Sequence, residues 1–153
     1  MRKFLLFLLF LCTFLISSGL FAYNLIDESK PVRIGDHYGA DVYFIPSSVQ
    51  RGLYGVYALL AYDCISEDKR EACRGVTMGM TRPADGYITK VVVEFNCSRR
   101  LFRVVYKEID DLNGYSVDRV DLSAAGAWGW KSVDEELPYL VKAYTMTCYG
   151  GLF

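Results

Sequence analysis

The chain has 153 residues, of which 52% are hydrophobic and 15% are aromatic, and its formal net charge at pH 7 is -1. This composition is typical of a packed globular domain and excludes a disordered tail. The near balance of charges offers no electrostatic basis for binding nucleic acid.

The start of the chain has the layout of a secretory signal peptide. Arg2 and Lys3 form a basic start, a charge-free and mostly apolar run begins at Phe4, and small residues precede Ala22. Cleavage after Gly19 and cleavage after Ala22 both fit. The run from Phe4 to Ala22 is also long enough to anchor the chain in a membrane if it stays uncleaved.

The predicted division of the chain is a signal peptide at residues 1–22, an irregular lead-in at 23–40 and one folded domain at 41–153. Removing Arg2 and Lys3 from the 17 basic residues leaves 15, against 18 acidic ones, so the exported part is mildly acidic. About 130 residues suffice for one domain with a real core but not comfortably for two.

Four of the five cysteines lie beyond the signal segment, which predicts two disulfides in an exported domain. Three connectivities are open. We favour Cys64 with Cys73, which closes a charged loop, and Cys97 with Cys148, which ties the middle of the chain to its end. A metal site is not predicted, because the chain has no CxxC pair and His37 is its only histidine.

After the lead-in, the sequence predicts two strands, a charged loop and a short third strand. DVYFIP is the first strand, which Pro46 ends. LYGVYALLAYD is the second, because its tyrosines and valines favour a strand over a helix. The segment ISEDKREA is expected to be a solvated loop. GVTMGMT is expected to be the short strand, followed by a turn that ends at Gly86.

The central feature is a predicted hairpin from Gly86 to Asp110, with its bend at Ser98-Arg99-Arg100. Alternation makes the first strand half-buried, with one face formed by Val91, Val93, Phe95 and Cys97. The second strand is expected to have one face formed by Phe102, Val104 and Tyr106, and the other by Leu101, Arg103, Val105 and Lys107. Asn113-Gly114 then predicts a tight turn into an edge strand, YSVDRVDL.

A C-terminal helix is predicted from about Glu135 to Thr147. Ser132 and Glu135 match a capping box, and Gly150 and Gly151 would stop the helix. Apolar residues recur at helical spacing: Leu137, Leu140, Val141, Tyr144 and Cys148. The predicted fold class is therefore α+β, a single antiparallel β-sheet of about five to six strands packed against a C-terminal helix and stapled by disulfides.

No catalytic, cofactor-binding or metal-binding residues are predicted. The acidic groups Asp110-Asp111 and Asp134-Glu135-Glu136 are adjacent residues at a turn and a helix start, where carboxylates are usually solvated or capping. His37 is expected to be exposed to solvent, and no nucleophile elbow occurs in the sequence. Trp128 and Trp130 are interpreted as covers of the core rather than ligand platforms.

The most basic and aromatic part of the chain follows the bend of the hairpin. One interpretation is a charged turn and the solvent face of a strand. The other is a contact surface for an acidic or amphipathic partner. The candidate partner-binding residues are Arg99, Arg100, Phe102, Arg103, Tyr106 and Lys107.

The order of features between Val42 and Cys148 resembles the surface-adhesin protein E family of Gram-negative bacteria. The matching stretches are DVYFIPSSVQRG, VVVEFNCSRRLFRVVYKEID, DLNGYSV and WKSVDEELPYLVKAYTMTC. Cys64 and Cys73 look like an addition to that pattern. The resemblance implies an α+β domain exported to the periplasm or outer surface of the envelope, and adhesion to host extracellular-matrix or plasma proteins.

We therefore expect an exported, non-enzymatic envelope protein that binds a protein partner, with a host matrix or plasma protein as the class that the resemblance implies. The alternative is a periplasmic inhibitor or accessory subunit of an envelope machine, because small disulfide-stapled β domains also fill such roles. The expected contact with a membrane is through the signal segment, if it stays uncleaved. The sequence leaves the oligomeric state open.

Overall fold

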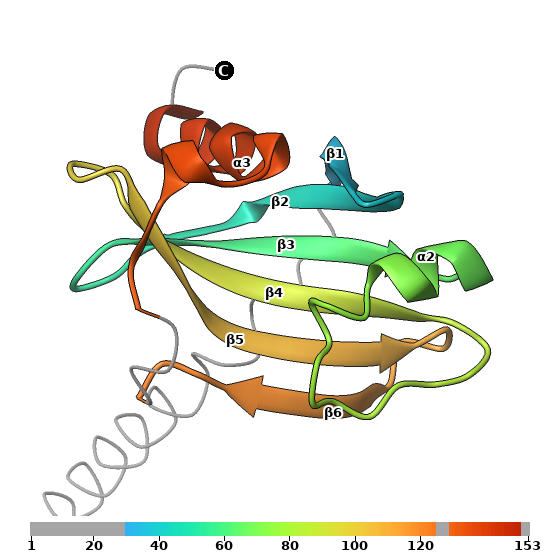
Figure 1. The fold of residues 1–153 in the computed structure, drawn as a ribbon. Coiled ribbons are helices and arrows are strands. Elements are labelled where there is room, and N and C mark those ends of the chain that lie inside the picture. Colours follow the sequence, from blue (N-terminus) through green and yellow to red (C-terminus); the bar gives the residue numbers. More distant parts are fainter. Residues whose placement is uncertain (1–29, 125–128, 151–153) are drawn as a thin grey trace, which may run out of the picture.

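The computed structural model describes residues 30–124 and 129–150, which form one antiparallel β-sheet with a helix across one face (Figure 1). The six main strands lie in the order of the sequence, β1-β2-β3-β4-β5-β6, and a short β7 pairs with the start of β5. The strands are β1 (Val32–His37), β2 (Ala40–Arg51), β3 (Val56–Cys64), β4 (Tyr87–Asn96), β5 (Leu101–Asp111), β6 (Ser116–Asp121) and β7 (Lys131–Ser132). The helices are α2 (Glu67–Ala72), a 3-10 turn η1 (Val133–Glu135) and α3 (Pro138–Tyr149). The predicted fold class is confirmed.

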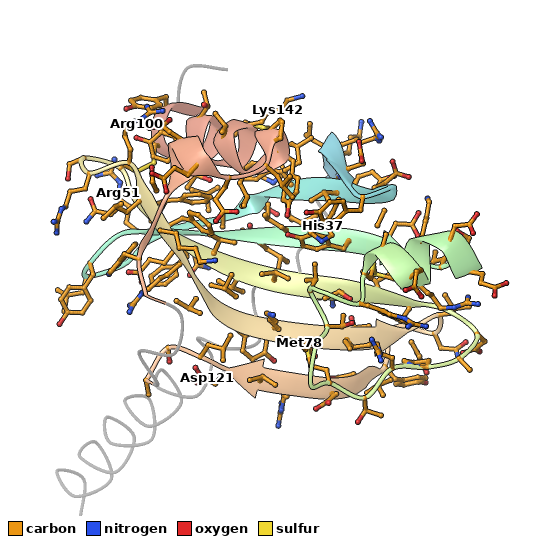
Figure 2. All side chains as sticks on the ribbon, in the orientation of Figure 1. His37, Arg51, Met78, Arg100, Asp121 and Lys142 are labelled. Carbon is orange, nitrogen blue, oxygen red and sulfur yellow. A yellow bond between two sulfur atoms is a disulfide. The ribbon has the colours of Figure 1, made fainter. Side chains whose placement is uncertain are left out.

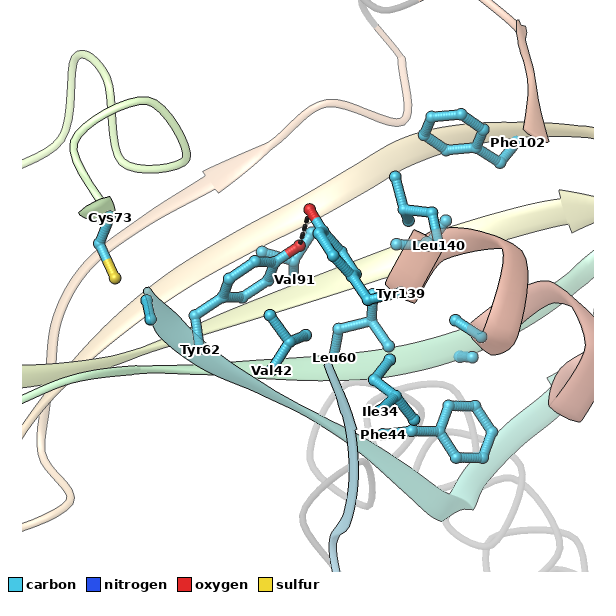
Figure 3. Packing of buried hydrophobic residues seen from close by; sticks show 14 of the residues in the cluster. Ile34, Val42, Phe44, Leu60, Tyr62, Cys73, Val91, Phe102, Tyr139 and Leu140 are labelled. Carbon is cyan, nitrogen blue, oxygen red and sulfur yellow. Dashed lines mark hydrogen bonds between the residues drawn. The ribbon is translucent and has the colours of Figure 1, made fainter. Parts of the chain in front are cut away.

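The main core lies between the sheet and α3, on what we call the helix-side face. Strand residues such as Val42, Phe44 and Leu60 are almost completely buried there (Figure 3). Ala143 and Tyr144 of α3 pack against them. Burial of this apolar area supplies the main driving force that holds the helix on the sheet.

The opposite face of the sheet carries a second, smaller cluster. It consists of Ile45, Leu59, Val92 and Val105, which are at most 9% exposed. Strand β4 therefore contributes buried side chains to both faces, and even Glu94 on this opposite face is fully buried. The expectation of a half-buried strand is wrong for β4, because β4 lies near the middle of the sheet.

Both predicted disulfides are confirmed. The Cα atoms of Cys64 and Cys73 are 6.1 Å apart, and those of Cys97 and Cys148 are 5.6 Å apart. The second bond joins the end of β4 to the last turn of α3, as the predicted packing of the helix requires. The two bonds fit an oxidising compartment outside the cytoplasm.

The N-terminal part of the sheet differs from the prediction in two ways. The lead-in is not irregular from Val32 onward, because β1 pairs with β2. Pro46 does not end the first predicted strand, and β2 continues to Arg51 through a shift in register. Ser48 explains the continuation: its hydroxyl donates to Ile45 O (2.6 Å) and accepts from Leu59 N (2.8 Å), so a side chain bridges the interrupted ladder. The predicted lead-in residues 23–29 and the signal segment lie outside the described residues.

The segment between the first two paired cysteines is solvent-accessible, as predicted, but it forms a helix instead of a loop. Ser66 caps α2 by accepting a hydrogen bond from Lys69 N (3.4 Å). The Lys69 ammonium also lies 2.7 Å from Asp41 and 2.5 Å from Asp63, so α2 is fixed to β2 and β3. The GVTMGMT segment that follows forms turns instead of the predicted strand, and its Thr77 hydroxyl donates to Cys73 O (2.9 Å).

A β-bulge in the central hairpin changes which side chains share a face. The hairpin itself is confirmed, but the register between β4 and β5 shifts so that Val93 pairs with Val104 while Val92 pairs with Tyr106. Val105 is the extra residue. Tyr106 therefore joins the opposite-face cluster, whereas Lys107 turns toward the helix-side face. The predicted common face of Phe102, Val104 and Tyr106 is wrong, because a one-residue insertion exchanges the faces beyond it.

The C-terminal helix is shorter at its start than predicted. Residues 133–135 form the separate turn η1, and Ser132 makes no capping hydrogen bond with its side chain. Helix α3 begins at Pro138 because a proline forces the residue before it, Leu137, into an extended conformation. The predicted tight turn at Gly114 (φ +82°) and the edge position of β6 are confirmed.

Candidate functional site

The six predicted partner-binding residues do not lie together on one surface. Phe102 is buried under α3, and Lys107 is buried beneath the segment that connects α2 to β4. Arg103 and Tyr106 project from the opposite face. Arg99 and Arg100 are exposed at the bend of the hairpin. Strand alternation and the bulge together divide a stretch that is compact in sequence between two faces of the sheet.

An open cleft lies on the helix-side face, between α3 and the connection from α2 to β4. Its volume is about 270 Å³. The floor is formed by strand side chains and the two walls by the helix and the connection. The lining includes Val91, Val93, Phe102, Val104, Gly75, Val76, Tyr139 and Leu140. The lining is mainly apolar, which is typical of sites that bind an apolar group.

Three aromatic side chains close one end of the cleft. Tyr62 donates a hydrogen bond to Tyr139 (3.3 Å between hydroxyl oxygens), and the Tyr139 hydroxyl lies 3.2 Å from His37 Nδ1 (Figure 3 shows the tyrosine pair). The three rings meet edge to face at centroid distances of 5.8–6.0 Å. The chain of contacts joins β1, β3 and α3 at this end.

The prediction that His37 is exposed to solvent is wrong. The imidazole is half-buried among tyrosine rings, and this burial lowers its pKa, while the nearby Asp36 carboxylate opposes that shift. Burial likewise raises the pKa of the Tyr62 hydroxyl well above its usual value, so Tyr62 stays neutral. These side chains therefore place hydrogen-bonding groups at this end of the cleft.

Basic groups lie at the other side of the cleft. Lys107 Nζ donates to Val76 O at 2.7 Å, which fastens the connection over β5, and burial lowers the pKa of this lysine. Lys131 also lines the cleft, and its ammonium lies 3.7 Å from the Glu136 carboxylate. The connection is held again at its far end, where Thr81 N donates to Asp118 on β6 (2.7 Å).

The bend of the hairpin has its own set of contacts. The Arg100 guanidinium pairs with the Asp134 carboxylate through two hydrogen bonds and lies 5.1 Å from the centre of the Tyr144 ring. The Arg100 guanidinium holds the pKa of Asp134 below its usual value. Tyr144 in turn donates to Cys97 O (2.7 Å) beside the disulfide. These contacts fix the C-terminal half of α3 to the hairpin.

The acidic groups considered in the sequence have structural partners. Asp110 is only 5% exposed, not solvated, and pairs with Lys90 across the sheet. Asp111 accepts hydrogen bonds from Asn113 N and Tyr115 N, both at 2.9 Å, and so caps the Asn-Gly turn. Among residues 30–124 and 129–150, no group of three or more histidine, cysteine or acidic side chains could hold a metal ion.

The helices in the described part of the chain are too short or too polar to cross a membrane. The predicted signal segment and Trp128 lie outside that part. Comparison with known proteins adds no family assignment: the sequence matches no family model, and no curated protein or solved structure is significantly similar to it.

Sequence reasoning missed the cleft because its parts come from distant segments. Tyr62 and Tyr139 are 77 residues apart, and His37 and Tyr139 are 102 apart. Each of these residues has an ordinary local explanation in a strand or on an apolar helix face. The sequence signal that could have indicated the cleft was the pair Tyr139 and Leu140, an aromatic and an apolar residue at the start of the predicted amphipathic helix.

Proposed function

We propose that this chain is an exported, non-enzymatic domain that binds a protein partner through the cleft on its helix-side face. The observation that carries the proposal is the cleft itself, a mainly apolar hollow with aromatic walls on a disulfide-stapled domain. Apolar pockets with aromatic borders are where the anchoring side chains of protein interfaces bind. The two disulfides fit an oxidising compartment, where an exported binding protein would work.

The size of the cleft favours a protein over a small molecule. Sites for drug-sized ligands usually have volumes of roughly 300–1,000 Å³, and this cleft of about 270 Å³ lies below that range. It suits one or two apolar side chains of a partner. Exposed residues at its border extend the contact, because Tyr38 is 78% exposed and lines the cleft. Met78 of the adjacent connection is 74% exposed (Figure 2), and tyrosine and methionine are enriched in interfaces.

The charges around the cleft indicate the chemistry of the partner segment. Lys107 and Lys131 contribute two ammonium groups to the lining, against one carboxylate from Glu136. An apolar segment with an acidic residue beside its anchor would complement this arrangement. The partner class remains the one that the family resemblance implies, a host extracellular-matrix or plasma protein.

The test uses the purified chain from residue 23 onward, with its disulfides formed. Binding to immobilised fibronectin, laminin, collagen and fibrinogen is measured by surface plasmon resonance. Tyr38→Asn removes the exposed aromatic group at the cleft, and asparagine tolerates the positive φ of 51° at this position. We expect it to weaken binding about tenfold. Tyr115→Asn is the matched control, because Tyr115 is 73% exposed at the turn between β5 and β6.

Equal loss in both variants, or binding to none of these proteins, would oppose the proposal. Protease treatment of intact cells separates it from the alternative function. Digestion of the domain is expected for a surface adhesin, whereas complete protection would favour a periplasmic inhibitor or accessory subunit.

A further inference from the structure

A second hollow lies at the end of the sheet where β4 turns into β5. Its volume is about 380 Å³. It is lined by Tyr54, Asn96, Arg99, Leu101, Arg103 and Trp130. The Arg103 side chain projects from the face opposite α3, because it pairs with Glu94, while the neighbouring Val93 and Phe95 belong to the core under α3. Of the residues that line this hollow, Arg103 also borders the helix-side cleft, whereas the other five do not line that cleft.

The guanidinium of Arg103 is held in a fixed position at this hollow. Arg103 Nε donates to the fully buried Glu94 carboxylate at 2.6 Å. On its other side, the guanidinium carbon lies 4.9 Å from the centre of the Trp130 ring. Within the described residues, Arg103 donates its side-chain hydrogen bond through Nε, so its terminal nitrogens keep donors for a ligand. A cation positioned in this way loses little side-chain entropy on binding an anion.

The remaining polar groups of the hollow are also donors. Asn96 Oδ1 accepts hydrogen bonds from Ser98 Oγ (3.0 Å) and Arg99 N (3.1 Å), which leaves its amide nitrogen to donate. Arg99 is exposed and supplies a second guanidinium. No carboxylate is among the residues that line the hollow in the described part of the chain. A matching ligand must therefore present acceptors, and an anionic group matches best.

The apolar part of the hollow offers flat aromatic surfaces. Tyr54 is 70% exposed and Trp130 is 37% exposed. Aromatic rings next to hydrogen-bond donors can contact the apolar face of a ring-shaped ligand while the donors bind its substituents. An acidic peptide would offer carboxylates on flexible chains, without a ring to cover these surfaces. The combination of exposed rings, two guanidinium groups and an amide donor therefore favours a sugar ring that carries an acid group.

We propose that this hollow is a binding site for an acidic saccharide, one whose rings carry carboxylate or sulfate groups. The acid group binds Arg99 and the terminal nitrogens of Arg103. The sugar ring contacts Trp130 and Tyr54, and the Asn96 amide donates to a ring substituent. The proposal does not depend on the partner that occupies the helix-side cleft.

The test measures binding of defined ligands to the disulfide-bonded chain from residue 23 onward by isothermal titration calorimetry at low and at physiological salt. The ligands are a heparin tetrasaccharide, a hyaluronan tetrasaccharide, the neutral chitotetraose and a hexaglutamate peptide. We expect at least one acidic saccharide to bind at least tenfold more tightly than both chitotetraose and hexaglutamate. Hyaluronan carries carboxylate groups alone, whereas heparin carries carboxylate and sulfate groups, so the comparison shows whether sulfate strengthens binding, and either result supports the proposal.

Two variants test the location. Arg99→Ala should weaken binding of the acidic saccharide about tenfold, and Trp130→Leu should weaken it while the near-ultraviolet spectrum and the unfolding temperature confirm the fold. Arg82→Ala is the matched control, because Arg82 is an exposed arginine that lines a different hollow. The proposal is overturned if neither acidic saccharide binds, if chitotetraose or hexaglutamate binds as tightly, or if Arg82→Ala weakens binding as much as Arg99→Ala.

Discussion

Glu94 and Arg103 face each other across β4 and β5, with Arg103 Nε donating to Glu94 Oε2 at 2.6 Å. The Glu94 side chain is completely buried, whereas the Arg103 side chain is 23% exposed. Glu94 Oε1 has no hydrogen-bond partner within the described residues. Burial, followed by the negative charge of Glu94, raises the pKa of the nearby Tyr57. Arg103 is thus the cation that compensates a carboxylate deep in the sheet.

Removing that cation should be costly. We expect Arg103→Leu to lower the free energy of unfolding by about 3–5 kcal/mol, because it leaves an uncompensated buried carboxylate. The double variant Glu94→Leu/Arg103→Leu should recover much of the loss, since neither charge remains. Urea unfolding followed by circular dichroism measures both. A double variant less stable than the single one would show that the pair stabilises the sheet in its own right.

The two disulfides should differ in their contribution to stability. The Cys97–Cys148 bond closes a loop with a sequence separation of 51, against 9 for Cys64–Cys73. In the chain-entropy model these loops correspond to about 4 and about 2.5 kcal/mol. Replacing Cys97 and Cys148 by serine should therefore lower the unfolding midpoint in urea more than replacing Cys64 and Cys73. The reverse order would contradict the entropic account.

Glycine should be required at position 86. Gly86 has φ +120°, and a Cβ atom there would lie 2.8 Å from Ile65 O. Gly114 also has positive φ (+82°) but has open space around the same position. We expect Gly86→Ala to cost at least 2 kcal/mol, on the order of the larger strain penalties, and Gly114→Ala to cost about 1 kcal/mol. Thermal unfolding of the two variants compares them, and equal losses would argue against steric contact with Ile65.

Stability should fall on acidification through the pKa of His37. Burial lowers the pKa of His37 below its ordinary value of 6.5 in the folded state, so the unfolded chain binds more protons in this range. The contribution of the neutral imidazole is fully present above pH 6.5 and is lost progressively as the pH falls toward the lowered value. The carboxyl groups with shifted pKa, such as Asp41 and Asp118, titrate below 3.8 and lie outside this window.

The measurement is the unfolding temperature between pH 7.5 and 5. The unfolding temperature of the wild-type chain should fall as the pH is lowered over this range, and that of His37→Gln should fall less. A parallel decline in both would place the titrating group elsewhere.

Local patterns in the sequence were enough to predict the sheet, the two hairpins, the C-terminal helix and both disulfides. These features depend on strand alternation, on the Asn113-Gly114 turn and on helical spacing. The features that were missed depend on contacts between distant segments. Ser48 carries β2 past Pro46 by bonding to β3, and the bulge at Val105 moves Lys107 to the other face.

The candidate sites were harder to predict than the fold. The basic stretch from Arg99 to Lys107 was correctly located on the hairpin, but its side chains serve different surfaces. Arg100 and Arg103 each pair with a carboxylate, on Asp134 and Glu94. Reversing all the charges of this stretch would therefore disturb the fold, so a charge-reversed variant cannot serve as a selective test of binding.

The order of the strands determines the order in which parts of the sheet can form while the chain is being made, N-terminus first. Each main strand pairs with the one made just before it, so the sheet can assemble progressively. The helix that covers its apolar face is the last element made. Cys64 meets its partner nine residues later and can pair early, whereas Cys97 must remain a thiol until Cys148 follows 51 residues later. The order in which the cysteines appear thus favours the native pairing, while the nascent sheet stays prone to aggregation until the final helix arrives.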